Sequence, residues 1–179
     1  MKICLTGGIA CGKSLLSRYL NELGVETIDA DDVVHELIPD PAERRRLAAE
    51  VFADPVKRKA LEAKIHPIVK ERIEAFLGNG SLRLAIIPLL FETHWNENYD
   101  IICAVVSEKE TQIARMMTTR GYSRQEAEAR LAAQMPVEEK AKRSHYVIHN
   151  DGSPEELKEE TRKLVDWLCQ KTSMSLPGR

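Results

Sequence analysis

The sequence has few cysteines, few aromatic residues and no long apolar run, and these shortages exclude several classes of protein. Its four cysteines form no C-x-x-C pair, which excludes a zinc cage and a dense disulfide framework. No stretch approaches the roughly 18 to 20 apolar residues of a membrane-spanning helix. Residues 1–9 contain too short an apolar segment for a signal-peptide core. We therefore expect a cytoplasmic protein with reduced thiols and no membrane partner.

An excess of one charge is also lacking. The 26 lysines and arginines against 28 aspartates and glutamates give a net charge of −2, which is too even for a protein that grips long nucleic acid through its phosphates. A small anionic ligand is compatible with this balance. Hydrophobic residues make up 43% of the chain, charged residues 30% and aromatic residues only 5%. This composition predicts a helix-rich soluble protein with one core and one or two excursions.

Apolar stretches alternate with helical patterns along the chain, which is typical of an α/β protein. Near-continuous apolar runs such as 84–91 suit parallel strands that are buried on both faces, and parallel strands need helical crossovers. We therefore predict a three-layer α/β fold with a five-stranded parallel sheet. The strands are expected at residues 2–6, 25–28, 82–88, 101–106 and 145–149.

Two segments are longer than simple crossovers and predict helical excursions from a core of residues 1–30, 81–107 and 144–171. Residues 31–80 form the first excursion and are expected to contain several helices, broken by prolines and closed by glycines. These helix-breaking residues are Pro39, Pro41, Pro55, Pro67, Gly78 and Gly80.

The second excursion, residues 108–143, is rich in arginine and predicts three helices. The first reaches Arg120, Gly121 interrupts the pattern, the second covers Ser123–Gln134 and the third follows Pro136. The chain is expected to end with a helix at 154–170, which has a capping box at Ser153, Pro154 and Glu156, and with a frayed tail at 172–179.

The segment GGIACGKS at residues 7–14 follows the first expected strand and precedes a helical pattern. It matches the phosphate-binding motif G-x-x-x-x-G-K-[ST] in the strand–loop–helix context that the motif requires. Lys13 can reach the β- and γ-phosphates, and the Ser14 hydroxyl can ligate Mg²⁺. We therefore predict a nucleoside triphosphate site formed by Gly8, Ile9, Ala10, Cys11, Gly12, Lys13, Ser14 and Leu15.

Cys11 admits two interpretations. Because it lies near a helix N-terminus, it is a candidate for a thiol of low pKa. The alternative is that it is simply a small residue of the loop.

A phosphate-binding loop alone does not distinguish kinases from GTPases, ATPases or motors. No N-K-x-D motif for guanine follows the loop, which disfavours a switch GTPase. The strand at 82–88 runs into Pro88-Leu89-Leu90-Phe91-Glu92 instead of the acidic pair that ATPase motors usually have. The two excursions suit a small-molecule kinase, in which one holds the acceptor and the other closes over the phosphates.

Three carboxylates follow the second expected strand, at Asp29, Asp31 and Asp32. Ligands gather at the carboxyl ends of parallel strands, so we expect these acids to face the phosphate site. Asp31 is the candidate that accepts the proton of the attacking hydroxyl or orients it. Alternatively, one of these acids is only the N-cap of the next helix.

Several motifs, in order over Lys2–Leu157, resemble the dephospho-coenzyme A kinase family. This resemblance implies a P-loop kinase-like fold, ATP with Mg²⁺, and transfer of the γ-phosphoryl group to the ribose 3′-hydroxyl of dephospho-CoA, the last step of coenzyme A biosynthesis. It also implies that residues 31–80 bind the acceptor and that residues 108–143 form a lid. The motifs are LTGGIACGKS at 5–14, IDADDVVHEL at 28–37, LEAKIHPIV at 61–69, IPLLFE at 87–92, QIAR at 112–115, RLAAQMPVEEKAKR at 130–143 and YVIHNDGS at 146–153.

The resemblance implies roles for individual residues. Asp31 matches the catalytic carboxylate, which acts with Lys13 and Arg115. Arg115 and Lys140 match basic positions of the lid region, where cations neutralise charge on the transferring group. The residues implied at the acceptor are Asp31, His66, Pro67, Leu89, Leu90, Glu92 and Lys140, and further lid candidates are Arg120, Arg124, Arg130 and Arg143.

Some alternatives are open. In one alternative, His66 is a residue at the start of a helix whose side chain forms hydrogen bonds with nearby backbone groups. In another, the arginines form a solvated helical face. The chain departs from the family pattern by a shorter stretch between His35 and Leu61, by the spacing of Arg120 from Arg115, and by Ser144-His145 where the family commonly has Ala-Asp.

Two other functions compete with the leading one, and the oligomeric state is open. They are another P-loop kinase, acting on a nucleoside monophosphate or a small alcohol, and a non-catalytic nucleotide sensor. His145 and His149, spaced by four on the last expected strand, lack a carboxylate partner and are assigned no metal.

Overall fold

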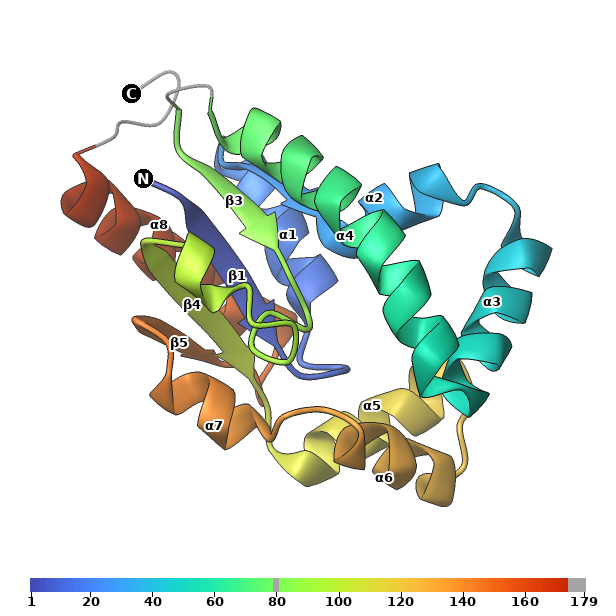
Figure 1. Cartoon of the computed structure of the whole chain (residues 1–179). Helices are drawn as coiled ribbons and strands as arrows, with labels where there is room; N and C mark the ends of the chain where they lie inside the picture. The colour runs from blue at the N-terminus through green and yellow to red at the C-terminus, as the bar shows by residue number, and fades with distance from the viewer. Residues whose placement is uncertain (79–80, 174–179) are drawn as a thin grey trace. The chain divides into compact units, whose positions relative to one another are not determined.

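Figure 1 shows the computed structural model of the chain, which describes residues 1–78 and 81–173. The side chains of residues 48, 49, 52, 53, 55 and 58 lie outside this description. The expected helix-breaking residue Gly80 and residues 174–179 of the expected tail also lie outside the described residues.

The helices and strands alternate along most of the chain. In order, they are β1 (Ile3–Gly7), α1 (Lys13–Glu22), β2 (Glu26–Asp29), α2 (Ala30–Leu37), α3 (Pro41–Ala53), α4 (Pro55–Leu77), β3 (Arg83–Ile86), the 3₁₀ turn η1 (Asn96–Asn98), β4 (Ile101–Val106), α5 (Lys109–Arg120), α6 (Arg124–Ala132), α7 (Val137–Lys142), β5 (Tyr146–His149) and α8 (Pro154–Thr172).

The five strands form one sheet in the order β2-β3-β1-β4-β5. β1 lies at its centre and pairs in parallel with β3 and β4, so that Leu5 lies opposite Ile86 on one side and Cys103 on the other. Every residue of β1 and β4 is buried, as expected for strands covered on both faces. The predicted α/β fold with a five-stranded parallel sheet is confirmed, although β3 is shorter than the expected strand at 82–88.

Apolar side chains of α1, α7 and α8 pack with those of the strands in one core. α1 and α8 pack against each other, and α7 packs on β1 and β4 (Figure 1). Leu16 and Leu20 of α1 and Leu164 of α8 are fully buried in this core. The capping box predicted for α8 is present: the hydroxyl of Ser153 accepts from the backbone N–H of Glu156, whose carboxylate accepts from the N–H of Ser153.

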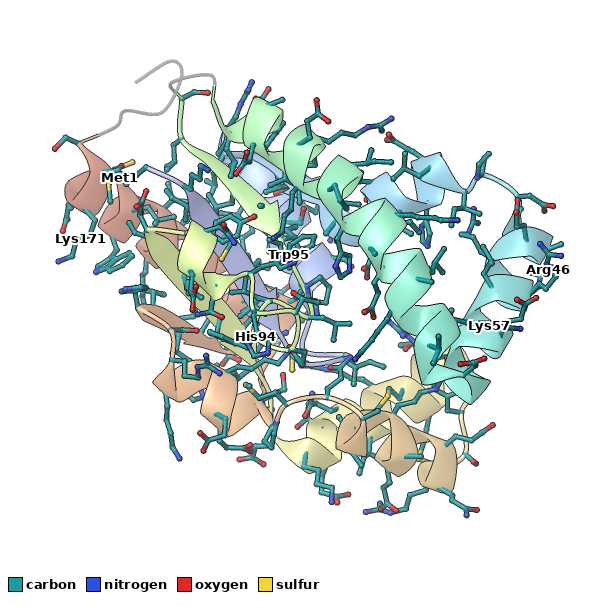
Figure 2. The ribbon with its side chains drawn as sticks, in the orientation of Figure 1. Met1, Arg46, Lys57, His94, Trp95 and Lys171 are labelled. Carbon is teal, nitrogen blue, oxygen red and sulfur yellow. The ribbon has the colours of Figure 1, made fainter. Side chains whose placement is uncertain are left out.

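The chain divides into two compact units, one of residues 1–27 with the residues from 81 onward, and one of residues 28–80. In the first unit Trp95 is buried while Lys171 is exposed, and in the second Arg46 is exposed (Figure 2). Among the described residues, no helix is both long enough and apolar enough to cross a membrane.

Each helix of the second unit begins at an aspartate. The side chains of Asp29, Asp40 and Asp54 accept hydrogen bonds from backbone N–H groups in the first turns of α2, α3 and α4, respectively. Pro41 and Pro55 are the first residues of α3 and α4, where proline loses no helical hydrogen bond.

The expected break at Pro67 is wrong, because α4 continues through this residue to Leu77. It follows that His66 is not a helix-start residue either. Proline has a helix-compatible φ and removes one hydrogen bond, and residues that favour helix surround it. Burial of Val69 and Ile73 on the same helix adds tertiary support.

The expectation that His145 and His149 both lie on the last strand is also wrong. His145 precedes β5, and its Nδ1 accepts a hydrogen bond from the backbone N–H of Ile102 at 3.0 Å, whereas His149 is the last residue of the strand.

The mid-helix proline predicts a stabilising substitution. Pro67→Ala restores a donor and removes a ring that crowds the carbonyl of Ala63, so we expect the unfolding free energy to rise by about 1–3 kcal/mol. Pro41→Ala is the matched control, since Pro41 already suits the first helical position, and it should leave stability nearly unchanged. Urea unfolding followed by circular dichroism measures both. A loss of stability in Pro67→Ala would show that the proline contributes packing that the helix needs.

Candidate functional site

The loop of residues 7–14, which we call the glycine-rich loop, joins β1 to α1. Gly12 is the N-cap of α1, with φ of 95°, and no side chain caps this helix. The first turn of α1 also lacks acidic residues. By contrast, an aspartate or serine side chain caps α2, α3, α4, α6 and α8. The start of α1 therefore offers N–H groups and the positive end of the helix dipole to an anion.

Two glycines of this loop are required by crowding. A Cβ at Gly12 would overlap the side-chain amide of Asn150, and the φ of this residue also disfavours other amino acids. A Cβ at Gly8 would overlap Val137 and the side-chain amide of Gln112. The loop is thus enclosed by residues that lie more than 100 positions later in the sequence.

Lys13 lies across the loop that precedes it. Its Nζ donates to the carbonyl oxygens of Gly7 at 3.0 Å and Gly8 at 2.8 Å. Ser14 follows on α1 and is exposed. An exposed hydroxyl at the start of a helix that no side chain caps fits Mg²⁺, which takes few protein ligands and completes its shell with waters and substrate phosphates. Among the described residues, no group of three His, Cys, Asp or Glu side chains is placed to hold a metal by itself.

Cys11 is buried within the loop, and burial raises the pKa of its thiol, although the positive charge of Lys13 acts in the opposite direction. The hypothesis of a low-pKa thiol is therefore wrong, because desolvation outweighs the nearby charge. Cys11 is a small buried residue whose sulfur accepts a contact from Gln112 Nε2 at 3.1 Å.

Arg115 on α5 reaches the loop. Its Nη1 donates to the carbonyl oxygen of Ala10 at 3.3 Å and to the hydroxyl of Ser107 at 3.0 Å. Other arginines of residues 108–143 are engaged elsewhere. Arg124 pairs with Glu110 and Glu128, Arg130 stacks on Tyr122, Arg143 stacks on Phe91, and Arg120 is exposed at the end of α5.

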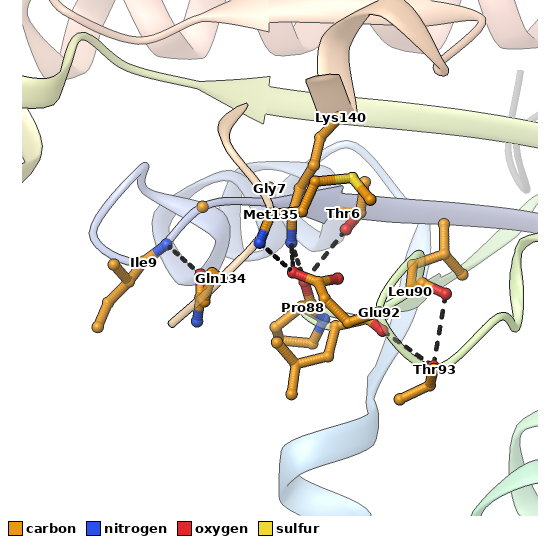
Figure 3. A network of polar contacts seen from close by, with 12 residues as sticks. Thr6, Gly7, Ile9, Pro88, Leu90, Glu92, Thr93, Gln134, Met135 and Lys140 are labelled. Atoms are coloured by element: carbon orange, nitrogen blue, oxygen red, sulfur yellow. Dashed lines mark hydrogen bonds and ion pairs between the residues drawn. The ribbon is translucent and has the colours of Figure 1, made fainter. Parts of the chain in front are cut away.

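Lys140 and Glu92 bind each other beside the loop (Figure 3). The side chain of Lys140 is 0% exposed, and its Nζ lies 2.9 Å from Glu92 Oε1 and donates to the carbonyl of Pro88 at 2.7 Å. The same carboxylate oxygen accepts from the backbone N–H of Met135 at 3.0 Å. Within residues 88–92, Leu89 is 43% exposed and Leu90 is fully buried.

In the second unit, one of the three carboxylates at the end of β2 and the start of α2 caps the helix. Asp29 Oδ1 accepts from the N–H of Asp31 at 2.9 Å and caps α2. Asp31 and Asp32 lie in the first turn of that helix and are exposed. The capping role that was open to any of the three therefore belongs to Asp29.

His66 and Pro67 lie midway along α4 in the same unit. His66 is half-buried, and burial lowers the pKa of its imidazole. Lys70 also lowers this pKa, while Glu62 raises it.

Sequence reasoning did not identify three of the residues that hold the loop. Gln112 donates to the carbonyl of Ile9, Gln134 accepts from the N–H of Ile9, and Asn150 donates to the carbonyl of Cys11. Each of the three lies inside one of the motifs named above, and its place in a motif was the signal that could have identified it. A side-chain amide that binds a distant backbone group leaves no spacing pattern to detect.

Comparison with known proteins identifies the family. A family model described as dephospho-CoA kinase matches residues 1–42 and 40–156. The chain belongs to the dephospho-CoA kinase family. A dephospho-CoA kinase from Geobacter sulfurreducens is 41% identical over 87% of this chain and 92% of its own length. One from Symbiobacterium thermophilum is 39% identical over 84% of this chain and 74% of its own length.

Solved structures agree with membership in the dephospho-CoA kinase family. A Thermus thermophilus protein has 34% identity and a TM-score of 0.80, covering 94% of this chain and 97% of that one. A dephospho-CoA kinase from Campylobacter jejuni has 25% identity and a TM-score of 0.62, covering 93% and 96%. A shikimate kinase from Acinetobacter baumannii has a TM-score of 0.66 at 16% identity, covering 95% and 93%, which shows a shared fold alone.

The buried state of Cys11 predicts slow alkylation. Because its thiol is enclosed and its pKa is raised, iodoacetamide at neutral pH should modify Cys11 at least about tenfold more slowly than Cys169, which is partly exposed. Mass spectrometry of tryptic peptides measures both rates, and in urea the two should become comparable. Fast modification of Cys11 in the folded protein would bring back the activated-thiol hypothesis.

Proposed function

We propose that this chain transfers the γ-phosphoryl group of ATP to the ribose 3′-hydroxyl of dephospho-CoA and so completes coenzyme A. The observation that carries the proposal is the start of α1, where an uncapped helix end lies beside Lys13 and Arg115 in a member of this family. Such a site stabilises negative charge as it develops on a transferring phosphoryl group.

The glycine-rich loop and the first residues of α1 are the proposed nucleotide site, formed by residues 8–15. Lys13 leaves the carbonyls of Gly7 and Gly8 to reach the β- and γ-phosphates. Ser14 is the residue that would hold Mg²⁺, which neutralises charge on the phosphate oxygens when bound. Arg115 adds a second positive charge at the loop.

Asp31 is the proposed catalytic carboxylate, which accepts the proton of the acceptor hydroxyl or orients this group. The capping bond of α2 uses Asp29, so the Asp31 side chain does not serve as this cap. The acceptor is proposed to contact residues of the second unit, of the stretch after β3 and of α7, namely Asp31, His66, Pro67, Leu89, Leu90, Glu92 and Lys140.

The parts of the chain are proposed to have separate roles. Residues 31–80 bind dephospho-CoA, and residues 108–143 form a lid that excludes water from the transfer. Residues 1–30, 81–107 and 144–171 form the nucleotide-binding core. We place the enzyme in the cytoplasm, in keeping with its four free cysteines.

Phosphate transfer to a panel of acceptors tests the function. We expect ATP to phosphorylate dephospho-CoA, but not AMP or shikimate, and coenzyme A to appear by mass spectrometry. Lys13→Ala should lower turnover by at least about a hundredfold, because a charge aimed at the γ-phosphoryl group in a dry site stabilises the transition state by several kcal/mol. A melting curve checks that this variant is folded. Transfer to AMP or shikimate in place of dephospho-CoA would contradict the proposed acceptor.

The role of Asp31 is tested by a matched pair of variants. Asp31→Asn should lower the transfer rate by about two to four decades with little change in ATP affinity, since a positioned general base is lost. Asp32→Asn removes the same charge from the same turn of α2 and should retain nearly full activity. Turnover, ATP affinity and melting temperature are measured on both. Near-wild-type turnover in Asp31→Asn would reject this base assignment, and it would move to Asp32 if Asp32→Asn loses turnover and to Asp29 if it does not.

A further inference from the structure

We propose that Gln112 and Gln134 are positioning residues for phosphoryl transfer: from the 108–143 segment, they hold the peptide groups of the glycine-rich loop in place. The proposal rests on the proposed function, because it takes the loop to bind the phosphates of ATP. It adds two neutral residues to a site in which the charged residues were the evident candidates.

Both glutamines bind one residue of the loop, Ile9. Gln112 Nε2 donates to the carbonyl oxygen of Ile9 at 2.7 Å, and the N–H of Ile9 donates to Gln134 Oε1 at 3.2 Å. Figure 3 shows the second of these contacts. Gln112 lies on α5, and Gln134 lies in the connection between α6 and α7. Two separate parts of the 108–143 segment therefore meet at the same loop residue.

The contact of Gln112 belongs to a row of three. The consecutive carbonyls of Ile9, Ala10 and Cys11 accept hydrogen bonds from the side chains of Gln112, Arg115 and Asn150, respectively. In a trans peptide the C=O and the following N–H point in opposite directions. Donors on the carbonyl side therefore fix the direction of the N–H groups that follow, and N–H direction is the property that a phosphate-binding loop requires.

The loop needs such external support because of its conformation. Ala10 has φ of 59°, a left-handed value that is unfavourable for a residue other than glycine. Such a conformation persists only where surrounding contacts impose it. The peptide groups on both sides of Ala10 are held, because Gln112 binds the carbonyl of Ile9 before it and Arg115 binds the carbonyl of Ala10 itself.

Hydrogen bonds hold this side of the loop where packing is incomplete. A cavity of about 230 Å³ lies beside it, and its lining includes Gly8, Gln112, Gln134 and Val137. Gln134 itself is located by its neighbour, because the N–H of Met135 donates to Glu92, the partner of the buried Lys140 (Figure 3). The ion pair of Lys140 and Glu92 thus helps to fix the position of Gln134, which binds Ile9.

The neutrality of these amides allows a sharp test at Gln134. Gln134→Glu keeps an oxygen acceptor for the N–H of Ile9 but adds a negative charge beside a phosphate site. Gln125 is the matched control, because it is an exposed glutamine on α6 of the same segment. The variants Gln134→Glu, Gln125→Glu, Gln134→Ala and Gln125→Ala are compared for ATP affinity without acceptor, melting temperature and kcat.

The two changes at Gln134 are expected to affect different quantities, ATP affinity in one variant and kcat in the other. Gln134→Glu should weaken ATP binding about tenfold or more through charge repulsion, whereas Gln125→Glu should change it less than about twofold. Gln134→Ala should lower kcat by about fivefold to fiftyfold while ATP affinity stays within about threefold. This variant displaces the loop but adds no charge beside the phosphates.

A second pair of variants tests Gln112. Gln112→Leu keeps much of the buried volume but removes the donor to Ile9, and it should lower kcat to a similar extent. Combined with Gln134→Ala, the loss in kcat should be smaller than the product of the two single losses, because both residues hold the same loop residue, Ile9.

The proposal is wrong if the Gln134 variants match their Gln125 controls in ATP affinity and kcat, or if the changes at Gln112 and Gln134 lower only the melting temperature. ATP binding is measured without dephospho-CoA. A wild-type protein that binds ATP but does not phosphorylate dephospho-CoA would therefore contradict the proposed acceptor and leave the affinity comparison at Gln134 valid.

Discussion

The carbonyls of Ile9, Ala10 and Cys11 in the glycine-rich loop find their hydrogen-bond partners outside the loop, and much of the first unit is arranged around this constraint. Glycines and small side chains leave the backbone of residues 7–14 accessible to a phosphate, but they supply no partners of their own. Side chains from α5, from the connection before α7 and from the turn after β5 bind its carbonyls and one N–H. The proposed nucleotide site is thus built by distant segments as much as by the motif itself.

Much of the fold could be predicted because burial leaves a pattern in the sequence. The apolar runs that became β1 and β4 are buried at every position, and parallel strands of this kind require the helices that follow them. The capping boxes at Ser123 and Ser153 and the left-handed Gly121 are local signals, and they end or begin helices in the structure as their chemistry dictates. The phosphate-binding motif is likewise local, so its position between β1 and α1 could be predicted.

The rest depends on competition between effects that the sequence does not rank. Pro67 favours a helix break, but the helix-forming residues around it and the buried face of α4 outweigh one lost hydrogen bond. Any of the three aspartates near the end of β2 could cap a helix, and the path of the chain makes Asp29 the residue that caps α2. The role proposed for Lys140 came from its place in a motif, and the sequence did not indicate that its side chain is buried and paired with Glu92. Contacts of this kind join residues far apart in the sequence, where no periodicity reports them.

The position of β1 has a consequence for synthesis on the ribosome. This strand is made first, but its partners in the sheet, β3 and β4, begin at Arg83 and Ile101. The loop that follows it acquires its last side-chain donor only when Asn150 has been made. The centre of the sheet therefore waits for most of the chain to emerge, and such long-range pairing folds slowly. The residues of the proposed nucleotide site are therefore synthesised well before the side chains that complete it.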